Sequence, residues 1–373
     1  MADHKTSAWP LALAYAVLIA YASLYPFEGW RLQGLAPWAF LASPWSRWWT
    51  AFDFTANALG YAPLGFLIAL AYLRSGVARR APAAVGLALA AGLGLSLLME
   101  GLQTFLPARV PSNLDLALNA FGALAGGVLA AMLERLGGLD RWSRFRERWF
   151  VGEARGALVL LALWPPALLF PPPVPFGLGQ VLERVERGLA EWLDDTPFLD
   201  WLPVREVELQ PLVPMAESLC VMLGLLVPCL LGYSVMTSLR GRLALAALAL
   251  GAGIGASALS SALSFGPAHA WAWVDAPSQL GLLTAGMLAA GLSPVPRRGC
   301  AALLLLALVV HLSLLNQAPA NAYFSLTLQA WEQGRFIRFH GLVQWLGWLW
   351  PYAALAYVLL RLSRSEPPSR IRS

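Results

Sequence analysis

The stretch 96–126, SLLMEGLQTFLPARVPSNLDLALNAFGALAG, places charged and amide side chains inside or beside two apolar segments. Placing such groups within a membrane costs free energy, so they normally face the interior of a helix bundle or a water-filled cavity. Glu100 and Gln103 are three residues apart. Asp115 and Asn119 are four apart. Each pair therefore shares one face of a helix, and the stretch predicts polar side chains that point toward a common interior.

Two prolines separate the two apolar segments. Pro107 and Pro111 interrupt helical structure, because proline has no amide hydrogen and restricts the residue before it. The two segments are therefore predicted to form a hairpin. Arg109 lies at its tip, from which its guanidinium is expected to reach either Glu100 or Asp115.

The composition of the whole chain is that of a membrane protein. Of its 373 residues, 58% are hydrophobic and only 13% are charged. A soluble domain is closer to about half apolar and about a quarter charged. We therefore predict an all-α, polytopic bundle of transmembrane helices with about ten spans, at roughly 20 apolar residues per crossing.

The predicted spans are 9–26, 52–73, 83–105, 113–133, 156–172, 212–237, 243–264, 277–292, 300–316 and 341–362. Lys and Arg concentrate in the even-numbered connections and at both termini, and such residues mark the cytoplasmic side. We therefore predict a multi-pass protein of the bacterial inner membrane with both termini in the cytoplasm. The hairpin tip would then lie on the outer side.

The net charge of +5 does not indicate a nucleic-acid partner, because the basic residues lie between apolar runs, where they set topology. The three cysteines lie in or at the edge of apolar segments, and no CxxC occurs. Neither a disulfide framework nor a metal site is expected, and no cofactor is predicted.

Four parts are predicted along the chain. They are a four-helix unit (1–135), a basic cytoplasmic linker (136–155), a second membrane unit (156–292) with an acidic extracytoplasmic loop (173–211), and two C-terminal spans with a basic tail (293–373). Within the acidic loop, apolar residues recur at helical spacing over 181–193, which indicates an amphipathic helix on the membrane surface.

The second unit echoes the first at a constant offset of 160 residues, which pairs Asn57 with Glu217 and Asp115 with Asp275. Membrane proteins are often built from such repeats. The echo is incomplete, because Ser260 stands where the first unit has Glu100. Two interpretations stay open: a degenerate duplication of a four-helix unit, or a chance alignment of apolar sequences.

The start of the second span adds two polar residues at the same predicted depth, Asp53 and Asn57, which are four apart. Polar residues from several helix ends are thus predicted to form one cluster near the outer surface. The candidate catalytic residues are Glu100 and Asp115, and the candidate ligand-binding residues are Asp53, Asn57, Gln103, Arg109 and Asn119.

Four motifs in the first 133 residues resemble the VanZ-like family of bacterial membrane proteins. They are SLYPF at 23–27, DxxxNxxGYxPLG at 53–65, ExxQ at 100–103, and RxxxxxDxxxNxxG at 109–122. The resemblance covers about a third of the chain and implies an envelope membrane protein. The family's named member is associated with resistance to the glycopeptide teicoplanin, and the resemblance supplies no mechanism.

Three classes of function stay open. The first is a module that binds or transports a membrane lipid or a lipid-linked cell-wall intermediate, because an Arg and carboxylates beside Trp-rich loops suit a zwitterionic or phosphorylated headgroup. The second is a membrane-embedded enzyme, with Glu100 as general acid or base and Asp115 or Asp53 as its ionised partner. The third is a structural protein of envelope assembly. No protein partner is predicted.

Several of these residues also have a structural interpretation. Asp115 follows Ser112 by three residues and suits a capping box, while Arg109 is placed to extend toward water from the interface. Glu100 is harder to explain in this way, because it lies well inside its helix. Two GxxxG pairs, 122/126 and 251/255, are interpreted as helix packing. His311, within an apolar span, is a weaker candidate for a proton relay.

Overall fold

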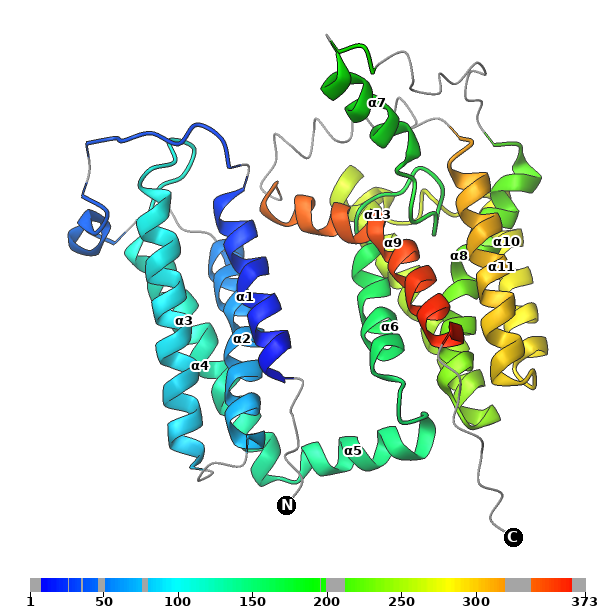
Figure 1. The fold of residues 1–373 in the computed structure, drawn as a ribbon, viewed down its shortest axis with the longest axis horizontal. Coiled ribbons are helices and arrows are strands. Elements are labelled where there is room, and N and C mark those ends of the chain that lie inside the picture. Colours follow the sequence, from blue (N-terminus) through cyan, green and yellow to red (C-terminus); the bar gives the residue numbers. More distant parts are fainter. Residues whose placement is uncertain are drawn as a thin grey trace. The chain divides into compact units, whose positions relative to one another are not determined.

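The computed structural model describes residues 8–25, 27–34, 36–45, 51–75, 80–194, 196–198, 212–318 and 337–363. Within these residues the regular structure is helical, with no strand (Figure 1). The predicted all-α class and the polytopic helical bundle are therefore confirmed.

In the described part of the chain, ten apolar helices occupy the ten predicted segments. They are α1 (Ala8–Leu24), α2 (Ala51–Arg74), α3 (Ala81–Gln103), α4 (Asn113–Arg135), α6 (Arg155–Ala167), α8 (Pro214–Val235), α9 (Leu239–Phe265), α10 (Ala276–Leu292), α11 (Arg297–Leu315) and α13 (Ile337–Ser363). Seven of them are long and apolar enough to cross a membrane, namely α2, α3, α4, α8, α9, α11 and α13. Helices α1 and α6 are shorter apolar helices, and α10 has 17 residues.

Contacts divide the chain into two compact units, Met1–Arg144 and Phe145–Ser373. In unit 1 the α2–α3 connection and the end of α4 lie at one end of the helices, and the α3–α4 hairpin lies at the other (Figure 1). We call these the basic end and the hairpin end. Helix α5 (Gly138–Trp149) follows α4. The finer division into four parts stays a prediction.

Unit 1 is built around a very close approach of α2 and α4. A Cβ atom on Gly122 would collide with the carbonyl oxygen of Ala58, and one on Gly126 would collide with that of Ala62. These backbones can approach so closely only because both positions lack a side chain, which is the geometry of small-residue packing in membranes. The GxxxG pair at 122/126 therefore packs as predicted.

The second GxxxG pair behaves differently. A Cβ atom on Gly251 or Gly255 of α9 would meet no heavy atom of the described residues within 4 Å. The packing interpretation is therefore wrong for this pair within unit 2. The same spacing serves a helix contact on α4 and an open surface on α9.

Unit 2 is organised around α8, in which every residue from Leu223 to Val235 is buried. Helices α6, α9, α10 and α11 pack on α8, and α13 packs on α6 and α11. Among its described residues, unit 2 thus has two apolar helices, α11 and α13, beyond a four-helix core.

The four-helix cores of the two units pack in matching pairs. In unit 1, α2 and α4 make the most extensive contact, and α1 contacts α2 and α3. In unit 2, α8 and α10 pair as α2 and α4 do, and α6 contacts α8 and α9 as α1 contacts α2 and α3. Asn57 bonds to Asp115, whereas Asp275, the counterpart of Asp115 at offset 160, accepts from the backbone N–H of Ser278 and caps α10. The helix pairing fits a duplication, which stays a prediction. A Cβ atom added to Gly286, the partner of Gly126 at offset 160, would meet no heavy atom of the described residues within 4 Å.

Arg242, which the sequence suggested only as a marker of topology, is a buried structural residue. Its side chain donates to the carbonyl oxygens of Ser293 (2.7 Å) and Tyr233 (2.9 Å), and also to those of Val295 and Met236. These carbonyls lie at the C-terminal ends of α8 and α10, where unpaired acceptors and the negative end of the helix dipole favour a cation. One guanidinium therefore joins two helix ends.

An irregular segment, residues 168–181, follows α6 and is largely buried. Phe176 has φ +62° and Gly179 has φ +96°, so the chain turns through left-handed conformations there. The hydroxyl of Tyr352 and the side-chain amide of Asn316 both donate to the carbonyl oxygen of Gly179. Buried non-helical backbone needs such partners, because no water is present to satisfy it.

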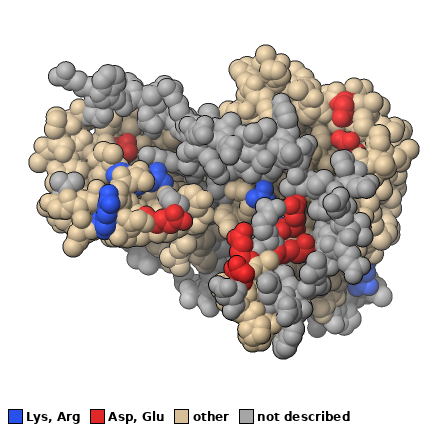
Figure 2. Space-filling view, turned by 90° about the horizontal axis from the view of Figure 1, so that it is seen from above, with Lys and Arg blue, Asp and Glu red and all other residues tan. Residues whose placement is uncertain are grey.

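The predicted amphipathic helix is confirmed as α7 (Leu182–Leu193). Val185, Leu189 and Trp192 are exposed along it. Acidic residues are visible on the face of unit 2 seen in Figure 2. Helix α7 itself carries Glu183 in its first turn.

Replacing Gly126 by Leu should destabilise unit 1, because the new side chain would push α2 and α4 apart. Overpacking of this kind typically reduces stability by about 1–3 kcal/mol or more. Thermal unfolding in detergent would show a lower melting temperature. Gly255→Leu is the matched control, since it adds the same side chain to a GxxxG position with open space, and it should leave the melting temperature near that of the wild type.

Replacing Arg242 by Gln should also destabilise the protein, because several buried carbonyl oxygens would lose a charged donor. A hydrogen bond to a charged group contributes about 1.5–3 kcal/mol. The neighbouring variant Arg240→Gln removes an exposed arginine from the same turn. If both variants unfold at the same temperature, the proposed role of Arg242 is wrong.

Candidate functional site

The candidate site lies at the hairpin end of unit 1, where α2, α3 and α4 each contribute two side chains four residues apart. Such pairs share one helix face, and the three faces meet inside the unit. We call the set the polar cluster; its members are Asn57, Tyr61, Ser96, Glu100, Asp115 and Asn119.

Glu100 is the most buried carboxylate of the polar cluster, with only 4% of its surface exposed. One of its oxygens accepts a hydrogen bond from the backbone N–H of Ser112, at 2.8 Å. Ser112 is the N-cap of α4, and its hydroxyl accepts from the backbone N–H groups of Leu114 and Asp115. Glu100 on α3 therefore fixes the N-cap residue of α4.

This bond changes the role of Asp115. In a capping box, the acidic residue three positions after the N-cap would accept the N–H of Ser112. Here Glu100 accepts that N–H, and the carboxylate of Asp115 instead accepts from the side-chain amide of Asn57 at 3.0 Å. The capping interpretation is therefore correct for Ser112, while the Asp115 carboxylate bonds across to α2.

Three members of the polar cluster lie one turn deeper. The side-chain amide of Asn119 donates to the hydroxyl of Ser96 at 2.9 Å, and both residues are buried. The side-chain oxygen of Asn119 and the hydroxyl of Tyr61 are buried without a hydrogen-bond partner among the described residues. Because buried polar atoms are nearly always paired, these two atoms are where a ligand or water would bond.

Gln103 and Arg109 bind the C-terminal end of α1 and the residue that follows it. The side-chain amide of Gln103 donates to the carbonyl oxygen of Ser23 at 2.9 Å, and the guanidinium of Arg109 donates to that of Tyr25 at 2.6 Å. Both acceptors belong to the SLYPF motif at 23–27. This contact explains why the motif and the hairpin occur together. The expected contact of Arg109 with Glu100 or Asp115 is not among the salt bridges of the described residues.

The chain after α1 continues across the hairpin. The backbone N–H of Arg31 donates to the carbonyl oxygen of Phe105, and the side chain of Gln33 donates to that of Thr104. Asn113 donates to the carbonyl oxygen of Ser43. The hairpin end is thus covered by a bonded loop.

Asp53 lies in the first turn of α2, and its side chain is outside the described residues. Tyr61 and Ser96 were not among the predicted site residues. The signal for both was the helical repeat, since Tyr61 is four residues after Asn57 and Ser96 is four before Glu100.

The family comparison covers this same unit. Residues 8–134 match the VanZ/LLP1 family model. The resemblance based on the four motifs is therefore confirmed for this part of the chain, which we call the VanZ-like domain because it matches that family model. Neither the curated proteins nor the solved structures gave a match. The polar cluster, Gln103 and Arg109 all lie within the VanZ-like domain.

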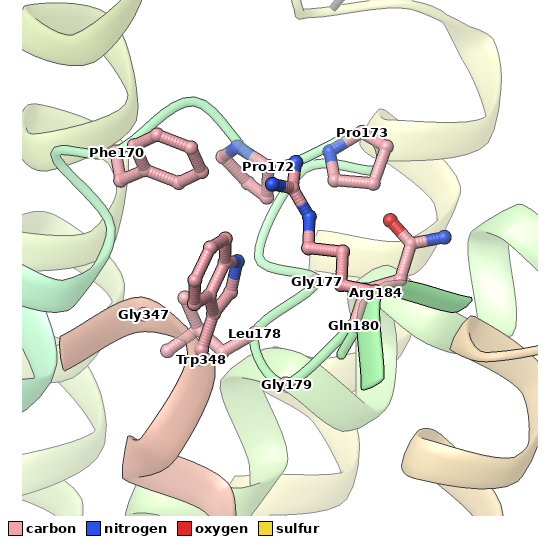
Figure 3. Close-up of a pocket in the computed structure, with 10 residues that line it drawn as sticks. All are labelled: Phe170, Pro172, Pro173, Gly177, Leu178, Gly179, Gln180, Arg184, Gly347 and Trp348. Atoms are coloured by element: carbon pink, nitrogen blue, oxygen red, sulfur yellow. The ribbon is translucent and has the colours of Figure 1, made fainter. Parts of the chain in front are cut away.

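Unit 2 offers less room for a ligand. A hollow beside segment 168–181 is lined by prolines, Gln180, Arg184 and Trp348 (Figure 3). The guanidinium carbon of Arg184 lies 4.6 Å from the ring centroid of Trp348. The hollow has a volume of about 20 Å³, whereas pockets for small molecules hold about 300–1,000 Å³. It therefore suits aromatic packing better than ligand binding.

His311 is buried in the core of unit 2, at 1% exposure, and neither ring nitrogen has a hydrogen-bond partner among the described residues. The small cavity beside it is lined by Trp164, Phe176 and Gly224. No group of three or more His, Cys, Asp or Glu side chains in the described part of the chain could hold a metal ion.

Replacing Glu100 by Leu should lower the stability of the VanZ-like domain, because the backbone N–H of Ser112 would lose its acceptor. An unpaired buried donor typically costs about 1–3 kcal/mol. Glu100→Gln is the conservative control, since its amide oxygen can still accept this hydrogen bond. Thermal unfolding should therefore show a clear loss for Leu and a small change for Gln; equal losses would mean that the charge itself holds the hairpin.

Proposed function

We propose that the VanZ-like domain binds the headgroup of an envelope lipid, or of a lipid-linked cell-wall component, at its hairpin end. Supporting this, the polar cluster gathers two carboxylates and several neutral donors and acceptors inside an apolar helix bundle. Intramembrane polar residues of this kind are functional more often than not, because their burial is unfavourable.

The observation that carries the proposal is a pair of buried polar atoms without a hydrogen-bond partner among the described residues, the hydroxyl of Tyr61 and the side-chain oxygen of Asn119. The remaining bonds of the cluster fix the positions of α2, α3 and α4. They leave these two atoms to interact with a ligand. A zwitterionic headgroup supplies donors for such atoms and for the carboxylates, while its phosphate suits the guanidinium of Arg109.

The proposal includes an orientation. Arginines at the basic end of unit 1 support a cytoplasmic position for that end, and in the proposed orientation the hairpin end lies at the outer leaflet of the bacterial inner membrane. Envelope lipids and cell-wall intermediates are present at that surface. A relation to glycopeptide resistance would follow if the bound component belongs to cell-wall synthesis.

An enzymatic function is the second candidate, and the burial of Glu100 favours it. A carboxylate in an apolar environment is a common general acid or base, with Asp115 as a second carboxylate nearby. The Glu100→Gln variant separates the two functions. It should abolish turnover of an enzyme while the fold and the retained lipid persist.

Native mass spectrometry should show a lipid retained by the wild-type protein and lost from Arg109→Ala. Loss of one charged hydrogen bond predicts about a tenfold or greater decrease in affinity. Arg31→Ala is the matched control, because Arg31 is an exposed arginine of the same end. Thermal unfolding of both variants would separate loss of binding from loss of fold.

Tyr61→Phe provides a second, milder variant. It removes only the unpaired hydroxyl and keeps the ring that packs in unit 1. Reduced retention by Tyr61→Phe at an unchanged melting temperature would support the proposed site. Equal retention by the wild type, Arg109→Ala and Tyr61→Phe would exclude headgroup binding there, and the structural role in envelope assembly would then be favoured.

A further inference from the structure

A groove runs between α3 and α4 at the basic end of unit 1, opposite to the polar cluster. It has a volume of about 450 Å³, within the range of about 300–1,000 Å³ that is typical of ligand sites. Its lining is almost entirely apolar and includes Val85, Gly86 and Leu89 of α3, and Leu124 and Val128 of α4, with Arg135 at one end.

The groove exists because of a missing side chain. Gly86 is exposed, and a Cβ atom added there would meet no heavy atom of the described residues within 4 Å. Deeper in the interface, Gly127 brings α4 against α3, because a Cβ there would lie 2.9 Å from the Cβ of Ala88. The helices are therefore in close contact behind the groove and open in front of it.

Among the described residues, the positively charged side chains near this groove, those of Arg135 and Arg80, lie at one of its ends. Arg135 is the last residue of α4, and Arg80 immediately precedes Ala81, which also lines the groove. The nearby acidic residues, Glu134 and Asp140, both pair with Arg74. Among the described residues, Arg135 and Arg80 form no salt bridge, so their charges are available to an anion.

We propose that the groove binds one anionic phospholipid, with an acyl chain along α3 and α4 and its phosphate at Arg135. An apolar channel that ends in arginine matches the two parts of such a lipid. Basic pockets between helices at the cytoplasmic surface are a recognised arrangement for anionic headgroups. If a helix of a partner protein occupied the groove instead, Arg135 would have no complementary charge unless that helix carried an acidic residue beside it. This site is separate from the one at the hairpin end and does not depend on it.

A larger side chain on the wall of the groove can fill it. Gly86→Leu places an apolar side chain in the space of the acyl chain, and the open surroundings of Gly86 predict that the fold is kept. Gly94→Leu is the matched control on the same helix, because a Cβ at Gly94 also meets nothing within 4 Å and Gly94 does not line the groove. Arg135→Gln tests the headgroup contact separately.

The test uses the full-length protein in nanodiscs of phosphatidylglycerol and phosphatidylcholine, followed by native mass spectrometry. The wild type and Gly94→Leu should retain one more phosphatidylglycerol molecule than Gly86→Leu. Arg135→Gln should reduce the preference for phosphatidylglycerol over phosphatidylcholine by about fivefold, the effect of about one arginine charge near a membrane surface.

Equal retention of phosphatidylglycerol by the wild type and Gly86→Leu would overturn the proposal. So would an equal loss in Gly94→Leu, because binding would then not be located in the groove. A dimer that Gly86→Leu dissociates would assign the groove to a second copy of the chain instead. Arg109→Ala should leave this retention unchanged, so failure here and failure of headgroup binding at the hairpin end can be told apart.

Discussion

A buried carboxylate on α3 accepts the backbone N–H that begins α4, and much of the hairpin end depends on this contact. The bond from Ser112 to Glu100 replaces the reciprocal half of a capping box. Because Glu100 takes that role, Asp115 is able to bond to Asn57 on α2. One interaction thus connects three helices, and it accounts for an acidic residue well inside an apolar helix.

The polar cluster combines structural and binding properties in the same few residues. Gln103 and Arg109 fix the C-terminal end of α1 and the residue that follows it, by donating to the carbonyl oxygens of Ser23 and Tyr25. Tyr61 and Asn119 each keep one buried polar atom unpaired among the described residues. A rigid frame that presents a few unsatisfied atoms is the arrangement that a specific polar site requires, since preorganised groups lose little freedom on binding.

The two units share their pattern of helix pairs but differ in chemistry. Where unit 1 has Glu100, unit 2 has Ser260, whose hydroxyl donates to the carbonyl oxygen of Leu169. This bond resembles that of Gln103 to Ser23, because each connects the third helix of a unit to the region where the first helix ends. Unit 2 therefore has a contact of the same kind, and in addition the guanidinium of Arg242 donates to backbone carbonyl oxygens at the ends of two helices.

The sequence by itself determined the helical class, the positions of the apolar helices, the hairpin and the amphipathic α7. These follow from composition, proline positions and local periodicity, which are properties of neighbouring residues. Only the tertiary structure decided which polar groups pair. It assigned the N–H of Ser112 to Glu100, made Arg242 a buried donor, and gave two identical GxxxG spacings opposite environments. The reason is that pairing depends on how each helix is rotated against its neighbours, and a single helix carries no information about that rotation.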